Sequence, residues 1–458
     1  MSAKVAFMQL SSCWGCHQSL LNAHLGLLKV LPELEIVYWP AVVDFKLESL
    51  KKRQDGEIIV GFIEGAIRNE QDRQNTLLMR KKCKIIVALG ACAVHGSVLG
   101  LANLYDKEDL LRRKFVEADS IGSSDVKGTW PKEHVPETTD RLMVVEDVID
   151  VDVKLPGCPP RTSNIVSAVL YLLTLLAPPQ GDPSKSVYDG VPKGESLVEK
   201  GELCFGSICA PSKDGSVYNK HEPWLGTYGL TNKPDMDRAK KLFELLSLKT
   251  KLTEEEAVKI KKFLMLALNL PGFEFMYFKG DPLQVLAKRP ESIKEEKVGN
   301  TKILVFKKTG IKIIDDIIGL CLLKLRDSNQ LKFNQATVCS TCERKVVDKT
   351  TAEFKRDYAG IADMNKCFLE QGYFCAGPAT KAGCGTICPN RANAPCLGCY
   401  GPQENIKDQG AKMLSTFASI FQGDPEVLKE KVLDPAGLFN RFTLAVSTLG
   451  GKIKDKEA

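Results

Sequence analysis

The sequence predicts an α/β protein in which a doubly wound parallel sheet is followed by an α-rich region that binds metal. Two observations support this prediction. The first 180 residues alternate β-rich runs with helical patterns, which is typical of a parallel sheet covered by helices. Farther along, eight of the 16 cysteines crowd into residues 339–399. Such a density of cysteines with little apolar periodicity indicates a region whose folding depends on bound metal.

The predicted strands place reactive side chains at one edge of the sheet. The strands lie within residues 4–10, 35–43, 56–65, 84–91 and 143–155, and a helix is predicted over residues 17–31. Strand ends are followed by Cys13, Cys16, Cys92 and Cys158. Ligands of open α/β sheets bind beyond the carboxyl ends of the strands, so we expect these four thiols to form one ligand set. A lone CWGC motif would also fit a thioredoxin-like redox pair, but GACAVHG and PGCPP at later strand ends favour the set.

The remainder of the chain divides into two further segments. A stretch rich in Pro, Gly, Lys and Ser begins near residue 178 and indicates a linker. We therefore expect domains over residues 1–182, 195–335 and 336–458. The elements expected in the last two domains are helices over residues 235–248, 253–270, 410–421 and 437–449 and a strand over residues 301–308.

The middle segment contains a phrase that resembles one in the last segment. Residues 204–229 begin CFGSIC and end PWLGTYG, whereas residues 384–401 begin CGTIC and end PCLGCYG. Trp224 and Thr227 stand where the later copy has Cys396 and Cys399. The segment over residues 195–335 is therefore predicted to be a metal-free, degenerate copy of the cluster-bearing unit, in which a buried, hydrogen-bonded Trp224 indole replaces a cluster edge. The alternative is a chance similarity between short Gly-rich turns.

The last eight cysteines are the clearest candidates for metal ligands. They are Cys339, Cys342, Cys367, Cys375, Cys384, Cys388, Cys396 and Cys399. Their CSTC and CLGC pairs would fit zinc knuckles. The absence of nearby histidines, the Pro or Gly beside most of these cysteines and their number favour iron-sulfur cubanes, each held by four thiolates. Cys83 and Cys321 lie in apolar runs and are predicted to be buried structural cysteines.

Composition and charge exclude several classes of function. The formal charge of +6 comes without a basic stripe, which argues against nucleic-acid binding. The longest apolar run, residues 164–179, is too short to span a membrane. The sequence opens without a secretory leader, and cytosolic thiols stay reduced, so we expect a cytoplasmic protein whose cysteines bind metal.

Three titratable side chains flank the first ligand set. Glu64 ends a predicted strand and would either accept neighbouring backbone amides or move protons coupled to electrons. His17 and His95 lie next to ligand cysteines, where each would either hydrogen-bond a cluster sulfur or serve a structural role.

These motifs together resemble a known family. The stretches CWGCHQSLL, FIEGAI, GACAVHG and LPGCPP are similar to the amino-terminal half of NiFe-hydrogenase small subunits. The stretches CFLEQGYFCAGPATKAGCGTICPN and PCLGCYGP, with CxxCxR at residues 339–344, resemble the carboxyl-terminal half of the cytoplasmic methyl-viologen-reducing (deazaflavin-non-reducing) and deazaflavin-reducing hydrogenases of methanogens and related archaea. The resemblance covers about residues 1–180 and 335–445.

The resemblance implies a flavodoxin-like first domain and three 4Fe-4S clusters. The proximal cluster would be held by Cys13, Cys16, Cys92 and Cys158, the medial one by Cys384, Cys388, Cys396 and Cys399, and the distal one by Cys339, Cys342, Cys367 and Cys375. The nickel-iron centre would belong to a partner large subunit. The chain would then act as the electron-transfer subunit of an oxidoreductase that serves hydrogen metabolism, passing electrons to an iron-sulfur or flavin subunit.

The sequence also departs from the family, which keeps two other functions open. Gln18 stands where respiratory members often have Glu, and 181 positions separate Cys158 from Cys339, which follow each other closely in similar chains. One alternative is a hydrogenase-derived relay in a complex without the NiFe site, serving a heterodisulfide-reductase-like or quinone-reductase-like partner. The other is a zinc-stabilised scaffold.

Overall fold

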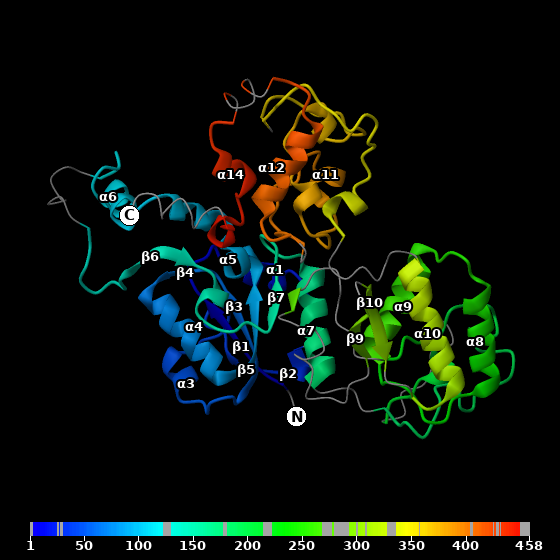
Figure 1. Ribbon diagram of the computed structural model, residues 1–458. Coiled ribbons are helices and arrows are strands. Elements are labelled where there is room, and N and C mark those ends of the chain that lie inside the picture. The colour runs from blue at the N-terminus through cyan, green and yellow to red at the C-terminus, as the bar shows by residue number, and fades with distance from the viewer. Residues whose placement is uncertain are drawn as a thin grey trace. The chain divides into compact units, whose positions relative to one another are not determined.

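The computed structural model spans Met1–Ala458 and divides into two compact units (Figure 1). Unit 1 comprises Met1–Val166, Glu274–Tyr277 and Asn334–Ala458, and unit 2 comprises Ser167–Phe273 and Phe278–Phe333. The described residues are 3–24, 27, 31–121, 130–176, 181–213, 222–267, 277–278, 293–298, 301–306, 309–327, 336–356, 358–403, 406–424, 426, 430 and 432–448. The predicted start of the linker and parts of the predicted elements, at residues 25–26, 28–30, 268–270, 307–308 and 449, lie outside them.

The centre of unit 1 is a parallel sheet (Figure 1). Its five strands that pair in parallel are β1 (Ala3–Gln9), β2 (Leu34–Tyr38), β3 (Ile58–Glu64), β5 (Cys83–Leu89) and β7 (Val153–Leu155). They pair in the order β2-β1-β3-β5-β7, and the short β8 (Tyr277–Phe278) follows at the β7 edge. Counted among the parallel strands, this order is the 2-1-3-4-5 of flavodoxin-like sheets. The prediction of an α/β protein with a parallel sheet is confirmed.

The central strands are apolar because both faces of the sheet are covered. Nearly every residue of β3 and β5 is buried, as is typical of a doubly covered parallel sheet. Gly61 in β3 leaves room for its neighbours, since a Cβ there would lie 2.6 Å from the Sγ of Cys83 and 2.8 Å from Met79. Cys83 therefore packs in the core beside a glycine, and Cys321 is likewise fully buried.

The helices of unit 1 differ from the sequence prediction in several places. The predicted helix over residues 17–31 is α1 (Gly15–Leu21), which ends in a turn. Within the predicted strand over residues 143–155, only Met143, which ends β6, and β7 are strand, because Val145–Asp147 forms a 3-10 turn whose Asp147 carboxylate accepts the Val144 amide. The other elements here are α3 (Leu47–Lys51), α4 (Glu70–Lys82), α5 (Gly90–His95), η2 (Ser97–Leu104), α6 (Lys107–Phe115), and the antiparallel pair β4 (Ile67–Asn69) and β6 (Thr138–Met143).

The cysteine-rich part of unit 1 contains little regular structure. Its elements are η5 (Val338–Thr341), η6 (Leu369–Gln371), η7 (Gly377–Ala379), α11 (Ile387–Arg391), α12 (Gln409–Ile420), α14 (Pro435–Phe439) and η8 (Leu444–Val446). Among the described residues of this part, only α12 exceeds two turns, so the expected α-rich region consists mostly of short turns around a small core that includes Phe368, Met413 and Phe417. The predicted last helix breaks into α14 and η8, with Asn440 to Thr443 between them.

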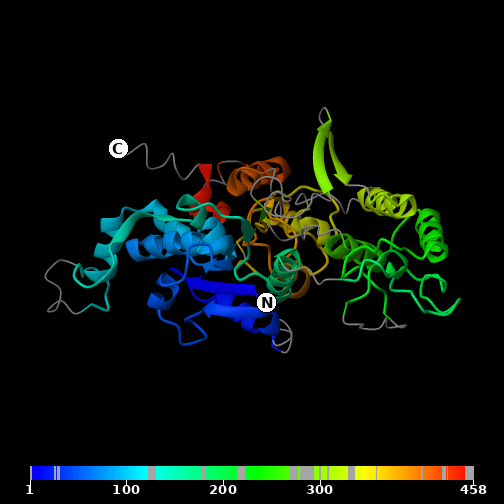
Figure 2. The same cartoon turned by 90° about the horizontal axis from the view of Figure 1, so that it is seen from below.

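Unit 2 has a hydrophobic core of its own. After α7 (Thr162–Leu176), which begins in unit 1, it contains η4 (Gly206–Ile208), α8 (Met236–Leu248), α9 (Glu254–Ala267), β9 (Ile293–Val298), β10 (Thr301–Phe306) and α10 (Lys312–Asp327). Helices α8 and α10 run side by side (Figure 1 and Figure 2). Their apolar residues join those of α9 in one core, where the ring of Phe263 from α9 stacks on that of Phe205 with the centroids 3.8 Å apart. Within the described residues, no helix combines the length and apolar character that crossing a membrane requires.

Candidate metal centres

The first four predicted ligands meet at the carboxyl edge of the sheet. Cys13 and Cys16 follow β1, Cys92 lies in α5 after β5, and Cys158 follows β7. Burial raises the pKa of the Cys16 thiol, and the negative charges of Glu64, Cys92, Cys158 and Cys13 raise it further. Burial likewise raises the pKa of Cys92 to about 12, with Cys158 and Cys13 contributing. The structure therefore brings the four sulfurs together.

Glycines and a serine shape the surroundings of these sulfurs. Gly90 has φ +88°, and a Cβ at that position would lie 2.2 Å from the Sγ of Cys16. The Oγ of Ser97 donates a 3.7 Å hydrogen bond to the Sγ of Cys158. The backbone at Gly90 thus approaches one ligand more closely than any side chain would permit.

Glu64 lies at the end of β3, between the strands that carry the ligands. Its carboxylate accepts the backbone N–H of Cys16 at 3.3 Å, and its side chain is only 1% exposed. Burial raises the pKa of Glu64, while amides of Cys16 and His17 lower it. Burial lowers the pKa of His17 to about 4, so the imidazole is neutral at pH 7 and its 3.4 Å approach to Glu64 is not an ion pair.

A second set gathers around η5 and η7. Burial raises the pKa of Cys339 to about 12, and the charges of Cys375, Cys367 and Cys342 raise it further. Burial raises the pKa of Cys375 to about 11, although backbone N–H groups of Gly377 and Cys396 donate to its sulfur and oppose the rise. The donation from Cys396 measures 3.3 Å.

The third set lies between the other two. Its members are Cys384, Cys388, Cys396 and Cys399. Burial raises the pKa of Cys399 to about 12, while the backbone N–H of Cys158, from the first set, donates to its sulfur and lowers it. Burial raises the pKa of Cys396, and the negative charges of Cys375 and Cys399 raise it further. The Cys158 backbone N–H thus lies near enough to the Cys399 sulfur to affect its pKa, and the 3.3 Å hydrogen bond from the Cys396 N–H to the Cys375 Sγ joins the third set to the second.

Comparisons with known proteins decide the family. The family described as "NADH ubiquinone oxidoreductase, 20 Kd subunit" matches residues 13–172. A subunit of the F420-non-reducing hydrogenase vhu of Methanocaldococcus jannaschii is 28% identical over 454 residues, with 99% of each chain covered. A subunit of the F420-non-reducing hydrogenase of Methanothermus fervidus is 40% identical over 117 residues, which cover 24% of this chain and 91% of that one.

The chain belongs to this family of hydrogenase small subunits. The "NAD-reducing hydrogenase HoxS subunit delta" of Cupriavidus necator is also similar, at 30% identity over 159 residues that cover 34% of this chain and 72% of that one. The family that the motifs resemble is thereby confirmed.

The donor atoms of this hydrogenase small subunit fit iron-sulfur clusters. Each set offers only sulfur atoms as donors to a metal, and backbone amides reach these sulfurs, as the amides of Thr386 and Cys396 do at 3.3 Å. Within the described ranges, no three His, Cys, Asp or Glu side chains gather as ligands of a single ion would. A cubane spreads its four cysteines around a body of iron and sulfide.

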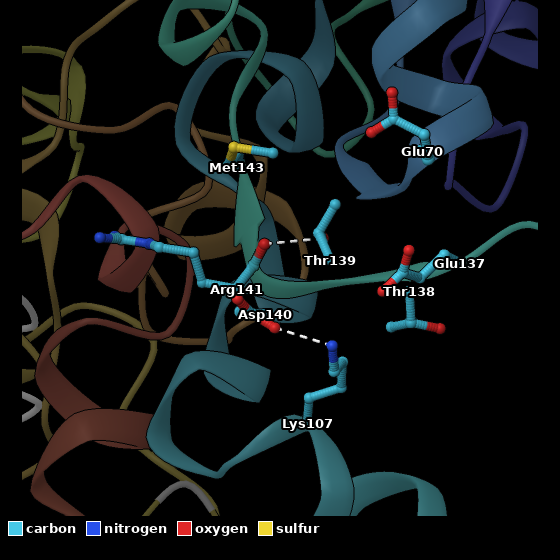
Figure 3. A pocket seen from close by; sticks show the side chains of 8 residues that line it. All are labelled: Glu70, Lys107, Glu137, Thr138, Thr139, Asp140, Arg141 and Met143. Atoms are coloured by element: carbon cyan, nitrogen blue, oxygen red, sulfur yellow. Dashed lines mark hydrogen bonds and ion pairs between the residues drawn. The ribbon is translucent and has the colours of Figure 1, made fainter.

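One pocket of the hydrogenase small subunit has no part in these sets. It encloses about 350 Å³ beside β6 and is lined by Glu70, Lys107, Glu137, Thr138, Thr139, Asp140, Arg141 and Met143 (Figure 3). Lys107 and Asp140 form a 2.8 Å ion pair at its wall. No cysteine lines the pocket.

Sequence reasoning missed a residue that joins two of the sets. The buried Tyr400 hydroxyl accepts hydrogen bonds from the backbone N–H of Arg161 at 3.0 Å and from the Nδ2 of Asn164 at 3.1 Å. The neighbouring Gly401 faces His95, whose Cε1 would lie 2.1 Å from a Cβ there. The YG that follows the last ligand was the available signal, but only the fold shows that it packs against the loop after Cys158.

Proposed function

We propose that this chain is the electron-transfer small subunit of a cytoplasmic NiFe-hydrogenase. It would pass electrons between a nickel-iron centre on a partner large subunit and an electron-accepting iron-sulfur or flavin subunit. Its relatives are hydrogenase subunits, which supports an oxidoreductase role for the complex. When bound, each 4Fe-4S cluster would supply a one-electron carrier.

The observation that carries the proposal is the serial arrangement of the three cysteine sets. The backbone N–H of Cys158, in the first set, lies near enough to the Cys399 sulfur of the third to lower its pKa, and the N–H of Cys396, in the third set, donates to the Cys375 Sγ of the second at 3.3 Å. Electron transfer weakens steeply with distance, so carriers in series must lie close together. The arrangement supports a proximal site at the edge of the sheet, a medial site at Cys384, Cys388, Cys396 and Cys399, and a distal site at Cys339, Cys342, Cys367 and Cys375.

The side chains around the sites would set their reduction potentials and exclude water. Burial removes solvent from sulfurs such as those of Cys16 and Cys375, and amide donors such as those of Thr386 and Cys396 would stabilise the extra negative charge of a reduced cluster. Both effects act on the ligand atoms themselves. Glu64 is proposed to orient the Cys16 loop through its hydrogen bond, and the proton-transfer role predicted for it remains part of the proposal.

Metal analysis and turnover test the proposal together. Anaerobically purified protein should contain about twelve iron and twelve sulfide per chain. Cys13→Ala should lose about four iron and abolish hydrogen-dependent viologen reduction by the complex, whereas Cys83→Ala, which removes a buried cysteine outside the sets, should retain all the iron. Stoichiometric zinc with little iron would reject the proposal in favour of the zinc-stabilised scaffold.

A second function is favoured by one observation. Residues 13–172 match the family described as a subunit of NADH ubiquinone oxidoreductase. The chain would then relay electrons in a complex without the NiFe site, for a quinone-reductase-like or heterodisulfide-reductase-like partner. A purified complex with full iron content but no hydrogen-dependent viologen reduction and no nickel would favour this second function.

A further inference from the structure

Unit 2 repeats the backbone hydrogen bonds of the cysteine-rich part of unit 1. In unit 1 the N–H of Cys396 donates to the Sγ of Cys375 at 3.3 Å, and the N–H of Ala376 donates to the carbonyl of Cys396 at 2.8 Å. In unit 2 the corresponding bonds run from Trp224 N to Cys204 Sγ at 3.1 Å and from Phe205 N to Trp224 O at 2.9 Å. Trp224 therefore corresponds to Cys396, and Cys204 corresponds to Cys375.

The correspondence extends in both directions along the chain. Three more backbone hydrogen bonds recur. The bond from Val338 N to Thr380 O (2.9 Å) recurs as Val187 N to Cys209 O (3.0 Å). The bond from Lys381 N to Gly401 O (2.9 Å) recurs as Ala210 N to Gly229 O (3.0 Å), and that from Gly401 N to Gly398 O (2.9 Å) recurs as Gly229 N to Gly226 O (3.0 Å). The 3-10 turn η7 corresponds to η4, and the Asp408 cap of α12 corresponds to the Asp235 cap of α8. Chance similarity between short turns does not explain so many matched bonds.

This register corrects the one expected from the sequence. An alignment of CFGSIC with CGTIC would make Cys209 equivalent to a ligand. The hydrogen bonds instead pair Cys209 with Thr380, which is no ligand. With this register, SLVEKGELC at residues 196–204 aligns with CFLEQGYFC at residues 367–375. Both stretches form the same turn, in which Gly201 and Gly372 each donate to the residue three positions earlier.

Three of the four distal ligand positions are replaced in unit 2. Because Val187 pairs with Val338, Tyr188 stands at the position of Cys339 and Val191 at that of Cys342. Ser196 stands at the position of Cys367, and Cys204 is the remaining cysteine. The glycines agree with this register, since a Cβ on Gly377 would lie 3.1 Å from Cys339 Sγ and a Cβ on Gly206 would lie 2.8 Å from the Tyr188 ring.

Side chains of unit 2 fill the replaced site and hold the loop around it. The hydroxyl of Tyr188 lies 2.9 Å from the Sγ of Cys204 and donates a hydrogen bond to it. The Arg238 guanidinium, from α8, donates to the carbonyls of Tyr188 at 3.3 Å and Val191 at 2.8 Å. Tyr188 and Val191 stand at ligand positions. The Tyr188 ring therefore occupies space that a cluster would fill, and the buried Arg238 guanidinium holds the loop that a cluster would otherwise hold.

We infer that unit 2 contains a closed, latent cluster site at Tyr188, Val191, Ser196 and Cys204. It would be a second copy of the distal site, and it takes no metal in the natural chain because only one thiol is left. Three substitutions to cysteine would restore the four-thiolate set that a 4Fe-4S cluster requires. This inference rests on the proposed function, in which Cys339, Cys342, Cys367 and Cys375 hold the distal cluster.

Two matched pairs of iron measurements test the inference on the full chain. In the first, Cys204→Ser should keep about twelve iron per chain, whereas Cys375→Ser should fall to about eight. In the second, the triple variant Tyr188→Cys, Val191→Cys and Ser196→Cys, reconstituted anaerobically with iron and sulfide, should rise to about sixteen. The same triple variant carrying Cys204→Ser should return to about twelve.

Each outcome has a distinct meaning. Loss of about four iron in Cys204→Ser would overturn the inference, because the site would be live. A triple variant with native circular dichroism and no extra iron would also overturn it. If the triple variant does not fold, the first pair still decides, since a serine closely matches the size of Cys204. An unchanged iron content in Cys375→Ser would instead refute the distal ligand set of the proposed function.

Discussion

Replacing Gly90 with alanine should remove the proximal cluster without touching any ligand. Gly90 has φ +88°, and its Cβ would lie 2.2 Å from the Sγ of Cys16. Ordinary contacts of a Cβ begin at about 3.0 to 3.4 Å, so the sulfur or the backbone must move by roughly 1 Å. The loop has little room to yield, because Ala91 donates its N–H to the carbonyl of Gly157 at 2.7 Å.

The size of this displacement decides the effect. Metal-ligand distances tolerate only about 0.2 Å, so a sulfur displaced by roughly 1 Å no longer serves as a ligand. The positive φ adds about 1 to 2 kcal/mol of backbone strain for a residue with a Cβ. We therefore expect Gly90→Ala to hold about eight iron per chain instead of about twelve.

The assay compares Gly90→Ala with a control that has the same kind of strain. Gly56 has φ +68° and no atom within 4 Å of its Cβ position, so Gly56→Ala introduces a positive-φ alanine without a collision. Iron content, the electron paramagnetic resonance signals of the reduced protein and hydrogen-dependent viologen reduction should change only in Gly90→Ala. Full iron content and normal turnover in Gly90→Ala would refute the proximity of Gly90 to a working ligand.

Four further predictions concern stability. Tyr400→Phe leaves two buried N–H donors without their acceptor and should cost about 1 to 3 kcal/mol in denaturant unfolding, with iron content retained. Burial lowers the pKa of His95 to about 3. Below about pH 6.5 the unfolded chain therefore binds a proton at this position that the folded chain does not, so the free energy of unfolding should fall by up to about 1.4 kcal/mol for each pH unit of acidification. His95→Asn should reduce this pH dependence of the free energy of unfolding between about pH 7 and 5. Arg238→Met should cost about 3 to 5 kcal/mol, measured as a roughly 10²- to 10⁴-fold faster hydrogen exchange in unit 2, because it leaves buried carbonyls and carboxylates without their cation. Because the Trp224 ring is only partly buried, Trp224→Ala should lower the free energy of unfolding by about 2 kcal/mol, and Trp224→Phe, which keeps a ring but loses the N–H, by less than about 1 kcal/mol. If both variants lost the same amount, the stabilisation would come from a hydrogen bond of the indole N–H, contrary to this expectation.

The parallel sheet was predictable because its signal is local. Each strand is an apolar run, and the alternation of strands with helices fixes a parallel arrangement. The predicted strand boundaries were wrong where a side chain forms a local hydrogen bond to the backbone that competes with strand pairing. Val145–Asp147 looks like part of a strand, but the Asp147 carboxylate accepts the Val144 amide and closes a turn instead.

Residue type alone predicts the three cysteine sets as ligands, which stays a prediction, whereas it does not predict the contacts between the sets. Cysteines at strand ends and in CxxC pairs indicate metal by their chemistry. No local pattern indicates that the amide of Cys158 reaches the sulfur of Cys399, 241 positions later by subtraction of the two residue numbers, or that Tyr400 accepts from Arg161. Those bonds depend on how the cysteine-rich part of unit 1 packs against the sheet.

The similarity between the two phrases is visible in the sequence, but the register that it suggests is wrong. Matching cysteines with cysteines pairs CFGSIC with CGTIC. Backbone hydrogen bonds show which positions are equivalent regardless of side chain, and by this criterion Cys204 is equivalent to Cys375. The expected role of Trp224 also changes, since its ring is only partly buried and, among the described residues, its buried Nε1 has no hydrogen-bond partner.

If unit 2 is a second copy of the distal site, the two copies differ in what would hold each chain segment together. In unit 1 the segment around the distal set has few long helices, and its small core is closed by cysteines such as Cys375 and Cys396. In unit 2 the same turns are backed by α8, α9 and α10, whose packed apolar side chains surround Phe205. Burial of apolar surface contributes roughly 25 cal/mol per Å², so three helices supply a stabilisation that a few turns cannot. If the inference holds, unit 2 therefore tolerates three non-ligand residues at these positions, where Arg238 and Tyr188 hold the loop, whereas the segment of unit 1, with its smaller core, would depend more on bound metal.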